Sequence, residues 1–172
     1  DPRHSVDLIA ATAHENPGLT IVCTGPLTNL ALALRRHDTL ASQIGRIITL
    51  GGAWGLGNKT AAAEWNILCD PEAAAIVYQS GIASTMIPVW GSGAVPSSDD
   101  MLAATNAVAG PIGILAADLM SSLRKVHRQP LIGPAHTPLH DPCARLAAAD
   151  PGLIRTAPAR VDIELAGRHT YG

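Results

Sequence analysis

The sequence predicts an α/β protein with a mostly parallel sheet flanked by helices. Three short apolar runs, at residues 19–25, 45–52 and 83–89, are typical of buried strands. Segments whose apolar residues recur at helical spacing lie before and between these runs. Strands that alternate with helices in this way pair in parallel, with the helices packed on the faces of the sheet. The order of the elements therefore indicates the fold class.

The individual elements follow from local signals. The first helix is expected from Val6 to about Asn16, and the second covers residues 27–36. The third covers residues 71–81, because a proline stands at its first position and a glycine just past its end. Further along we expect a loop at 91–100, a helix at 101–126 with a candidate break at Gly110-Pro111, a mobile Pro- and Gly-rich segment at 127–138, a helix from about Asp141 and a last strand at 159–165.

Composition excludes several classes of function. A chain of 172 residues with 47% hydrophobic and 15% charged residues suits one soluble globular domain. A net charge of −2 gives no electrostatic reason to bind nucleic acid or an anionic membrane, and no run is long enough to span a bilayer. The three cysteines are far apart, so neither a disulfide framework nor a zinc site is indicated. We therefore expect a cytoplasmic protein.

The glycine-rich stretch ITLGGAWGLGNKT follows the second predicted strand. In parallel α/β sheets ligands bind beyond the carboxyl ends of the strands, so this loop is a candidate binding loop. A phosphate-binding P-loop requires lysine at the position that Asn58 occupies, and Lys59 comes one residue late. The loop is therefore not expected to hold a phosphate, and Lys59 is expected on the surface.

Polar residues after this loop suggest a different ligand. Glu64 and Asn66 are two positions apart, so in an extended chain both side chains point the same way. Together with Asn58 they offer a carboxylate acceptor and two amides, which suits vicinal hydroxyls such as those of a ribose. The alternative is that they are ordinary surface residues of a connection.

A His-Asp pair stands at residues 140 and 141. Asp before proline is most often a helix cap or a turn, and four such dipeptides occur in this chain. Asp141 differs because His140 precedes it. The pair could be an acid beside a metal ligand or simply a capped helix, and the residues alone leave both interpretations open.

Five motifs in this order resemble the inosine–uridine preferring nucleoside hydrolases: TGPLTNLALAL, ITLGGAWGLGN, AEWNILCDPEAAAIV, LHDPCARLAAADP and VDIEL. The resemblance implies a Rossmann-like nucleoside hydrolase fold. It also implies Ca²⁺-dependent hydrolysis of the N-glycosidic bond of ribonucleosides, giving ribose and a free base. Family members of this kind form homodimers or homotetramers, which we expect here as well.

The resemblance also assigns roles to single residues. The backbone carbonyl of Thr24 and the carboxylate of Asp141 correspond to Ca²⁺ ligands, and His140 corresponds to the general acid. Side chains that correspond to contacts of the ribose are Leu50, Asn58, Glu64 and Asn66. His127 and His136 are candidates for contacting the base.

One family motif, an N-terminal D-x-D-P-G-x-D-D that supplies Ca²⁺ carboxylates and the base that activates water, does not occur in this sequence. Residues 1–172 therefore correspond to the central and C-terminal part of a single hydrolase domain, an incomplete fold. We expect this chain alone to have little or no hydrolase activity. The alternative is a non-catalytic descendant that binds ribose or nucleosides and has lost the metal site.

Overall fold

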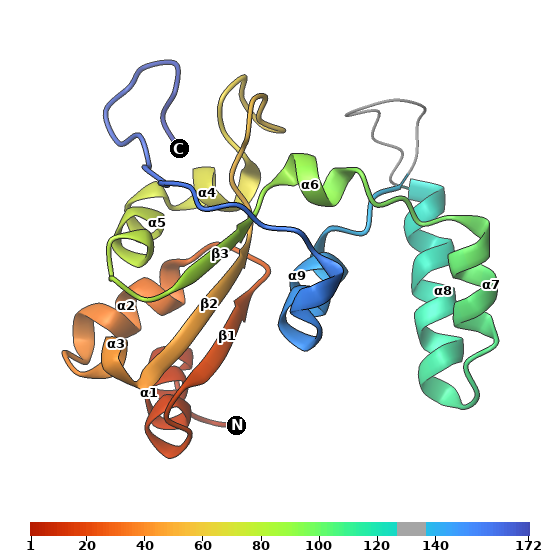
Figure 1. Cartoon of the computed structure of the whole chain (residues 1–172), viewed down its shortest axis with the longest axis horizontal. Helices are drawn as coiled ribbons and strands as arrows, with labels where there is room; N and C mark the ends of the chain where they lie inside the picture. The colour runs from red at the N-terminus through yellow and green to blue at the C-terminus, as the bar shows by residue number, and fades with distance from the viewer. Residues whose placement is uncertain (127–136) are drawn as a thin grey trace. The chain divides into compact units, whose positions relative to one another are not determined.

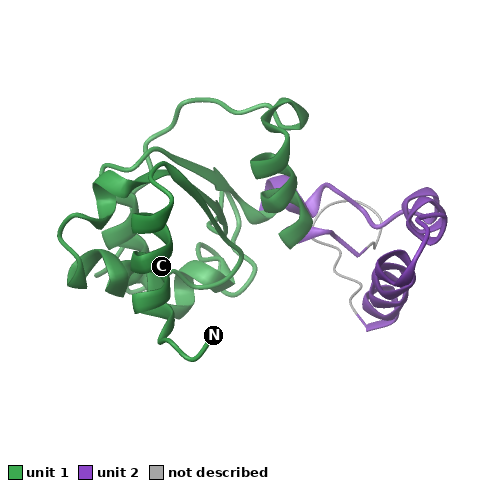
Figure 2. Ribbon diagram, turned by 90° about the horizontal axis from the view of Figure 1, so that it is seen from below, with its two compact units in different colours: residues 1–89, 141–172 green, residues 90–140 purple. Residues whose placement is uncertain are grey.

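The computed structural model describes residues 1–126 and 137–172. It divides into two compact units, one of residues 1–89 and 141–172 and one of residues 90–140 (Figure 2). The predicted contacts of His127 and His136 lie outside the described residues.

The first unit alternates helices and strands in the predicted order. Its elements up to residue 89 are α1 (Ser5–Glu15), β1 (Leu19–Cys23), α2 (Thr28–Arg36), α3 (Leu40–Gln43), β2 (Ile44–Leu50), α4 (Trp65–Cys69), α5 (Pro71–Tyr78) and β3 (Ser84–Ile87). The unit also includes most of α9 (His140–Ala149) and the 3-10 helix Pro151–Leu153. The short helices α3 and α4 are additions to the predicted set.

The three strands form one parallel sheet in the order β1-β2-β3. Cys23 pairs with Thr49, and Leu50 pairs with Ile87, so the carboxyl ends of the strands meet at one edge of the sheet. The prediction of a parallel sheet is confirmed. This register brings the loops after β1 and β2 next to each other.

Helices cover both faces of this sheet. Alternate residues of β2 point to opposite sides, so their contacts show which helix lies on which face. Thr49 lies on the side of α5, where its hydroxyl is 2.7 Å from the Tyr78 hydroxyl. Arg46 lies on the other side and donates to the backbone carbonyl of Ala148 in α9 at 3.0 Å. Figure 1 shows α1, α2 and α5 gathered on one side of the sheet and α9 on the other.

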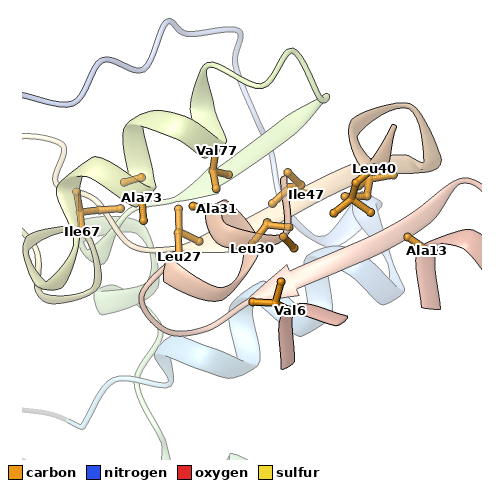
Figure 3. Close-up of a cluster of buried hydrophobic side chains, with 13 residues drawn as sticks. Val6, Ala13, Leu27, Leu30, Ala31, Leu40, Ile47, Ile67, Ala73 and Val77 are labelled. Carbon is orange, nitrogen blue, oxygen red and sulfur yellow. The ribbon is translucent and has the colours of Figure 1, made fainter. Parts of the chain in front are cut away.

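The main hydrophobic core lies between the sheet and helices α1, α2 and α5 (Figure 3). Ile47 of β2 is fully buried there, together with Leu30 of α2 and Val77 of α5. Burying a side chain of this size stabilises a fold by about 1.5–3 kcal/mol. The core holds the strands in register and so fixes the positions of the loops at their carboxyl ends.

The second unit contains most of α6 (Val89–Gly93), then α7 (Asp99–Asn106) and α8 (Pro111–Val126). The break predicted at Gly110-Pro111 is confirmed, since α7 ends before it and α8 begins at the proline. Ser98 caps α7 by accepting the Met101 N–H at 3.1 Å. The loop expected at 91–100 is thus partly helical at both of its ends.

One predicted element is wrong. Residues 159–165 form no strand, because their backbone makes no ladder with any strand in the described part of the chain. Ile163 is partly buried and packs against the hydrophobic core, which explains its apolar character. Glu164 ends the segment in a turn, where one carboxylate oxygen accepts the N–H groups of Ala166 and Gly167. These bonds lower the pKa of the Glu164 carboxyl.

Candidate functional site

The residues that sequence analysis places around a ribose gather where β1 and β2 end. Asn66, in α4, donates its side-chain N–H groups to the carbonyl of Leu50 at 3.0 Å and to that of Thr24 at 3.4 Å. Leu50 is the last residue of β2, and Thr24 directly follows the last residue of β1. The Asn66 amide therefore ties the two strand ends together, and Thr24, Leu50 and Asn66 are brought into contact.

Glu64 is the buried carboxylate of this group, with 5% of its surface exposed. Its Oε2 accepts three backbone N–H groups, from Gly52 at 3.0 Å, Asn66 at 2.9 Å and Ile67 at 3.2 Å. Within the described ranges, no hydrogen bond is made to its second oxygen, Oε1. One oxygen is thus used to hold the site together, and the other is available to a ligand hydroxyl.

The expectation that Glu64 and Asn66 lie in an extended chain is wrong. Glu64 itself is extended, with φ −91° and ψ 154°, but Trp65 starts α4. The reason is local, because the Glu64 side chain caps the N–H groups of the first turn and so favours a helix there. The Glu64 side chain still reaches Asn66, because Glu64 Oε2 accepts the backbone N–H of Asn66.

Asn58 joins the group from the glycine-rich loop. Its side-chain carbonyl accepts the Trp65 N–H at 2.9 Å, which adds a second cap to α4. Its side-chain nitrogen makes no hydrogen bond to any residue in the described part of the chain and is available as a donor. Lys59 is exposed, as predicted, with its Nζ 4.3 Å from the centre of the Trp65 ring.

Two glycines let the backbone pass close to the carboxylate. Gly51 and Gly52 have φ values of +147° and +83°, which side-chain-bearing residues rarely adopt. A Cβ at Gly51 would lie 2.9 Å from Glu64 Oε2, and one at Gly52 would lie 2.9 Å from the sulfur of Met86. The two glycines after β2 therefore allow a tight turn in which the Gly52 N–H donates a hydrogen bond to Glu64.

Cys23 of β1 and Tyr78 of α5 are half-buried, and both side chains are kept neutral. Burial raises the pKa of the Cys23 thiol, at the end of β1, to about 11. Burial also raises the pKa of Tyr78 to about 12, although its hydrogen bond with Thr49 acts in the opposite direction. Neither group adds a charge to the candidate site, whose polar side chains are those of Asn58, Glu64 and Asn66.

A second link joins two of the sequence motifs and has no signal in the sequence. The Thr28 hydroxyl donates to Asp70 Oδ2 at 2.5 Å, which ties α2 to α5. The other oxygen of Asp70 caps α5 by accepting the Ala73 N–H at 3.0 Å, as expected for Asp before proline. Thr28 and Asp70 are 42 residues apart, and no local pattern indicates that they meet.

His140 and Asp141 stand where the chain passes from the second unit to the first. His140 is half-buried, and its Nδ1 lies 2.8 Å from the Ser92 hydroxyl, a partner that the sequence analysis did not identify. Asp141 is exposed in the first turn of α9. No described contact joins Asp141 to the Glu64–Asn66 group, and His140 belongs to the other unit.

The described residues do not by themselves make a calcium site. Ca²⁺ takes about 6–8 oxygen ligands, and the two expected here are the Thr24 carbonyl and the Asp141 carboxylate, both of exposed residues. Among residues 1–126 and 137–172, no group of three or more His, Cys, Asp or Glu side chains is placed to hold a metal. The same ranges contain no helix of the length and apolarity that crossing a membrane requires.

The chain is thus an α/β protein with a cluster of polar residues at the carboxyl ends of parallel strands, the edge at which open α/β sheets bind their ligands. Its sequence matches the inosine-uridine preferring nucleoside hydrolases over residues 1–172, and the chain belongs to that family. The resemblance stated from the five motifs is thus confirmed.

Relatives with named activities support this assignment. The chain is 41% identical over 169 residues to the pyrimidine-specific ribonucleoside hydrolase RihA of Shewanella woodyi, covering 98% of this chain and 54% of that protein. Among solved structures, the purine-preferring ribonucleoside hydrolase of Gardnerella vaginalis matches with a TM-score of 0.89 and 30% identity, over 100% of this chain and 55% of that one. A plant nucleoside hydrolase matches with a TM-score of 0.86 and 32% identity, over 99% and 54% respectively. The chain spans about half the length of these relatives.

Proposed function

We propose that the protein carrying this chain hydrolyses the N-glycosidic bond of ribonucleosides and releases ribose and the free base. The observation that carries the proposal is the Glu64–Asn66 group at the carboxyl ends of β1 and β2, in a chain of the nucleoside hydrolase family. A buried carboxylate with one oxygen anchored to the backbone, beside amides, suits a sugar with vicinal hydroxyls. The relatives named above include a pyrimidine-specific and a purine-preferring enzyme, so the substrate class proposed is ribonucleosides in general.

The ribose is held by Asn58, Glu64 and Asn66. Glu64 Oε1 accepts a hydrogen bond from a ribose hydroxyl, while the Asn58 side-chain nitrogen donates to a ribose oxygen. Leu50 supplies an apolar contact beside the sugar. Since Glu64 Oε2 is fixed by three backbone N–H groups, its carboxylate does not have to reorganise when the sugar binds.

Cleavage of the bond leaves positive charge on the ribose ring and negative charge on the departing base. Groups that grip the sugar stabilise an oxocarbenium-like transition state of this kind. His140 donates a proton to the base as the bond breaks, which removes the negative charge from the leaving group. Histidine suits this role because its unperturbed pKa of about 6.5 lets it carry a proton near neutral pH.

Calcium is proposed as the cofactor. The Thr24 carbonyl and the Asp141 carboxylate would be two of its ligands, and the remaining oxygens would come from elsewhere in the whole protein. A bound Ca²⁺ lowers the pKa of a water that it coordinates. By the same argument, the 172-residue chain on its own has little or no hydrolase activity. We also propose that the protein acts in the cytoplasm as a homodimer or homotetramer, which light scattering of the purified protein would test.

Ribose release tests the proposed activity. The purified protein carrying this chain is incubated with a panel of purine and pyrimidine ribonucleosides, with Ca²⁺ and with a calcium chelator, and reducing sugar is measured. We expect release with Ca²⁺, loss with chelator and recovery when Ca²⁺ is added back. Glu64→Gln should lower the rate by about 10²-fold or more, the loss typical of removing a preorganised electrostatic contact.

The exposed Glu15→Gln variant, on α1, is the matched control and should retain the full rate. Nucleoside binding by calorimetry without any ribose release would instead support the non-catalytic descendant and refute the enzyme. Release that continues in chelator would refute the calcium proposal alone.

A further inference from the structure

The contact between Ser92 and His140 carries an inference beyond the proposed hydrolysis. Their side chains are 48 residues apart in sequence, and the Ser92 hydroxyl lies 2.8 Å from His140 Nδ1. Ser92 is buried, with 1% of its surface exposed. We propose that Ser92 is a positioning residue, which holds the proton on His140 Nδ1 and thereby assigns proton transfer to the base to Nε2. The proposal rests on His140 being the proton donor of the proposed function.

The fold builds this contact from two backbone hydrogen bonds. Leu139 donates to the Val95 carbonyl at 3.0 Å, and Ser97 donates to the Thr137 carbonyl at 2.8 Å. Between these bonds, Pro96 and Pro138 face each other as an antiparallel bridge. The bridge begins three residues after Ser92 and ends directly before His140. It therefore brings the two side chains together irrespective of the hydrogen bond between them.

The residue after Ser92 also lies beside the imidazole ring. A Cβ built on Gly93, the residue after Ser92, would lie 3.9 Å from His140 Cε1, the carbon between the two ring nitrogens. A side chain at position 93 would therefore touch this edge of the ring. A serine that is almost fully buried is restricted in its rotamers, so its oxygen presents a defined direction to Nδ1.

In the charged imidazolium, Nδ1–H donates to the Ser92 oxygen and Nε2–H donates to the departing base. When the glycosidic bond breaks, the Nε2 proton moves to the base, and the electron pair of the N–H bond stays on Nε2. The neutral ring then keeps its proton on Nδ1, still bonded to Ser92. The water that adds to the ribose cation releases one proton to solvent as the new C–O bond forms, and solvent returns one proton to Nε2 before the next turnover, so that no net proton is consumed.

Long-range ¹H–¹⁵N NMR of the histidine rings tests this assignment on the whole 172-residue chain. The signals of His140 are identified by their loss in His140→Gln. At alkaline pH, where the ring is neutral, we expect the wild-type ¹⁵N shifts to show the proton on Nδ1. A wild-type ring with its proton on Nε2 overturns the proposal, and this measurement needs no variant at the serine.

Variants at the serine separate positioning from general disturbance. Ser92→Ala should move the two ¹⁵N shifts of His140 toward the mixture of a free imidazole, and Ser92→Thr, which keeps the hydroxyl, should restore them. Ser97→Ala is the matched control, because Ser97 is also buried in this unit and its hydroxyl has no hydrogen-bond partner in the described part of the chain. Unchanged His140 signals in Ser92→Ala, or equal changes in Ser97→Ala, would refute the role of Ser92.

The NMR result is independent of catalysis. If the ring shows the expected tautomer and the protein releases no ribose, the proposed function fails and the positioning role stands. If ribose is released but the tautomer does not depend on Ser92, the hydrolase stands and the positioning role fails.

Discussion

Removing the Glu64 carboxylate is expected to destabilise the fold as well as the site. Glu64→Ala leaves three N–H groups without the oxygen that they share. Two of them, from Asn66 and Ile67, belong to the first turn of α4, and losing such a cap costs about 1 kcal/mol. The third, from the buried Gly52, becomes an unsatisfied donor at a cost of about 1–3 kcal/mol. We therefore expect a loss of about 2–4 kcal/mol, or roughly 10 °C in Tm for a chain of this size.

Urea unfolding of the 172-residue chain, followed by circular dichroism at 222 nm, measures this loss. Glu64→Gln keeps one acceptor oxygen but not its charge, so it should lie between wild type and Glu64→Ala. Glu15→Ala, an exposed glutamate at the end of α1, should stay within about 0.5 kcal/mol of wild type. If Glu64→Ala behaved like Glu15→Ala, the carboxylate would not be holding these N–H groups, and the reasoning on the site would be wrong.

Three further outcomes are expected from the same unfolding assay. Thr28→Val should cost about 1 kcal/mol, because it removes the donor to Asp70 between α2 and α5, and an equal loss in a variant that lacks Asp70 already would contradict that pairing. Gly52→Ala should cost about 1–3 kcal/mol, since its φ of +83° strains any side chain and its Cβ meets the Met86 sulfur. Adding Met86→Ala to the Gly52→Ala variant should remove only the steric clash with the sulfur and leave the backbone strain. Finally, burial raises the pKa of Cys23 from 9.0 to about 11, so the unfolded thiol ionises first and stability should fall as pH rises from 9 to 11. Cys23→Ala should flatten that fall.

Much of the fold was predictable because its signals are local. The strands β1, β2 and β3 are apolar runs bounded by glycine and proline, and α5 carries proline at its start. The wrong strand at 159–165 shows where local signals end. Its residues alternate as in a strand, but a strand exists only when another backbone pairs with it.

The site residues were predictable as a set of types but not as an arrangement. Glu64, Asn66 and Asn58 were selected for the hydrogen bonds that they can make, yet the sequence suggested an extended segment where α4 begins. The helix forms because the Glu64 side chain turns back on the backbone at Asn66 and Ile67. The same Glu64 oxygen also accepts the Gly52 N–H, a longer-range contact that only the folded chain determines.

The sequence by itself determined the class of fold, the family and the kinds of group at the strand ends, because these depend on periodicity and on motifs read along the chain. Only the tertiary structure decided which groups meet. The links from Asn66 to Thr24, from Thr28 to Asp70 and from Ser92 to His140 each join residues more than 40 positions apart. The first two depend on the parallel register and on helix packing, and the third on the bridge at Pro96 and Pro138. Contacts of that range depend on the packing of the whole chain, and no short stretch of sequence encodes them.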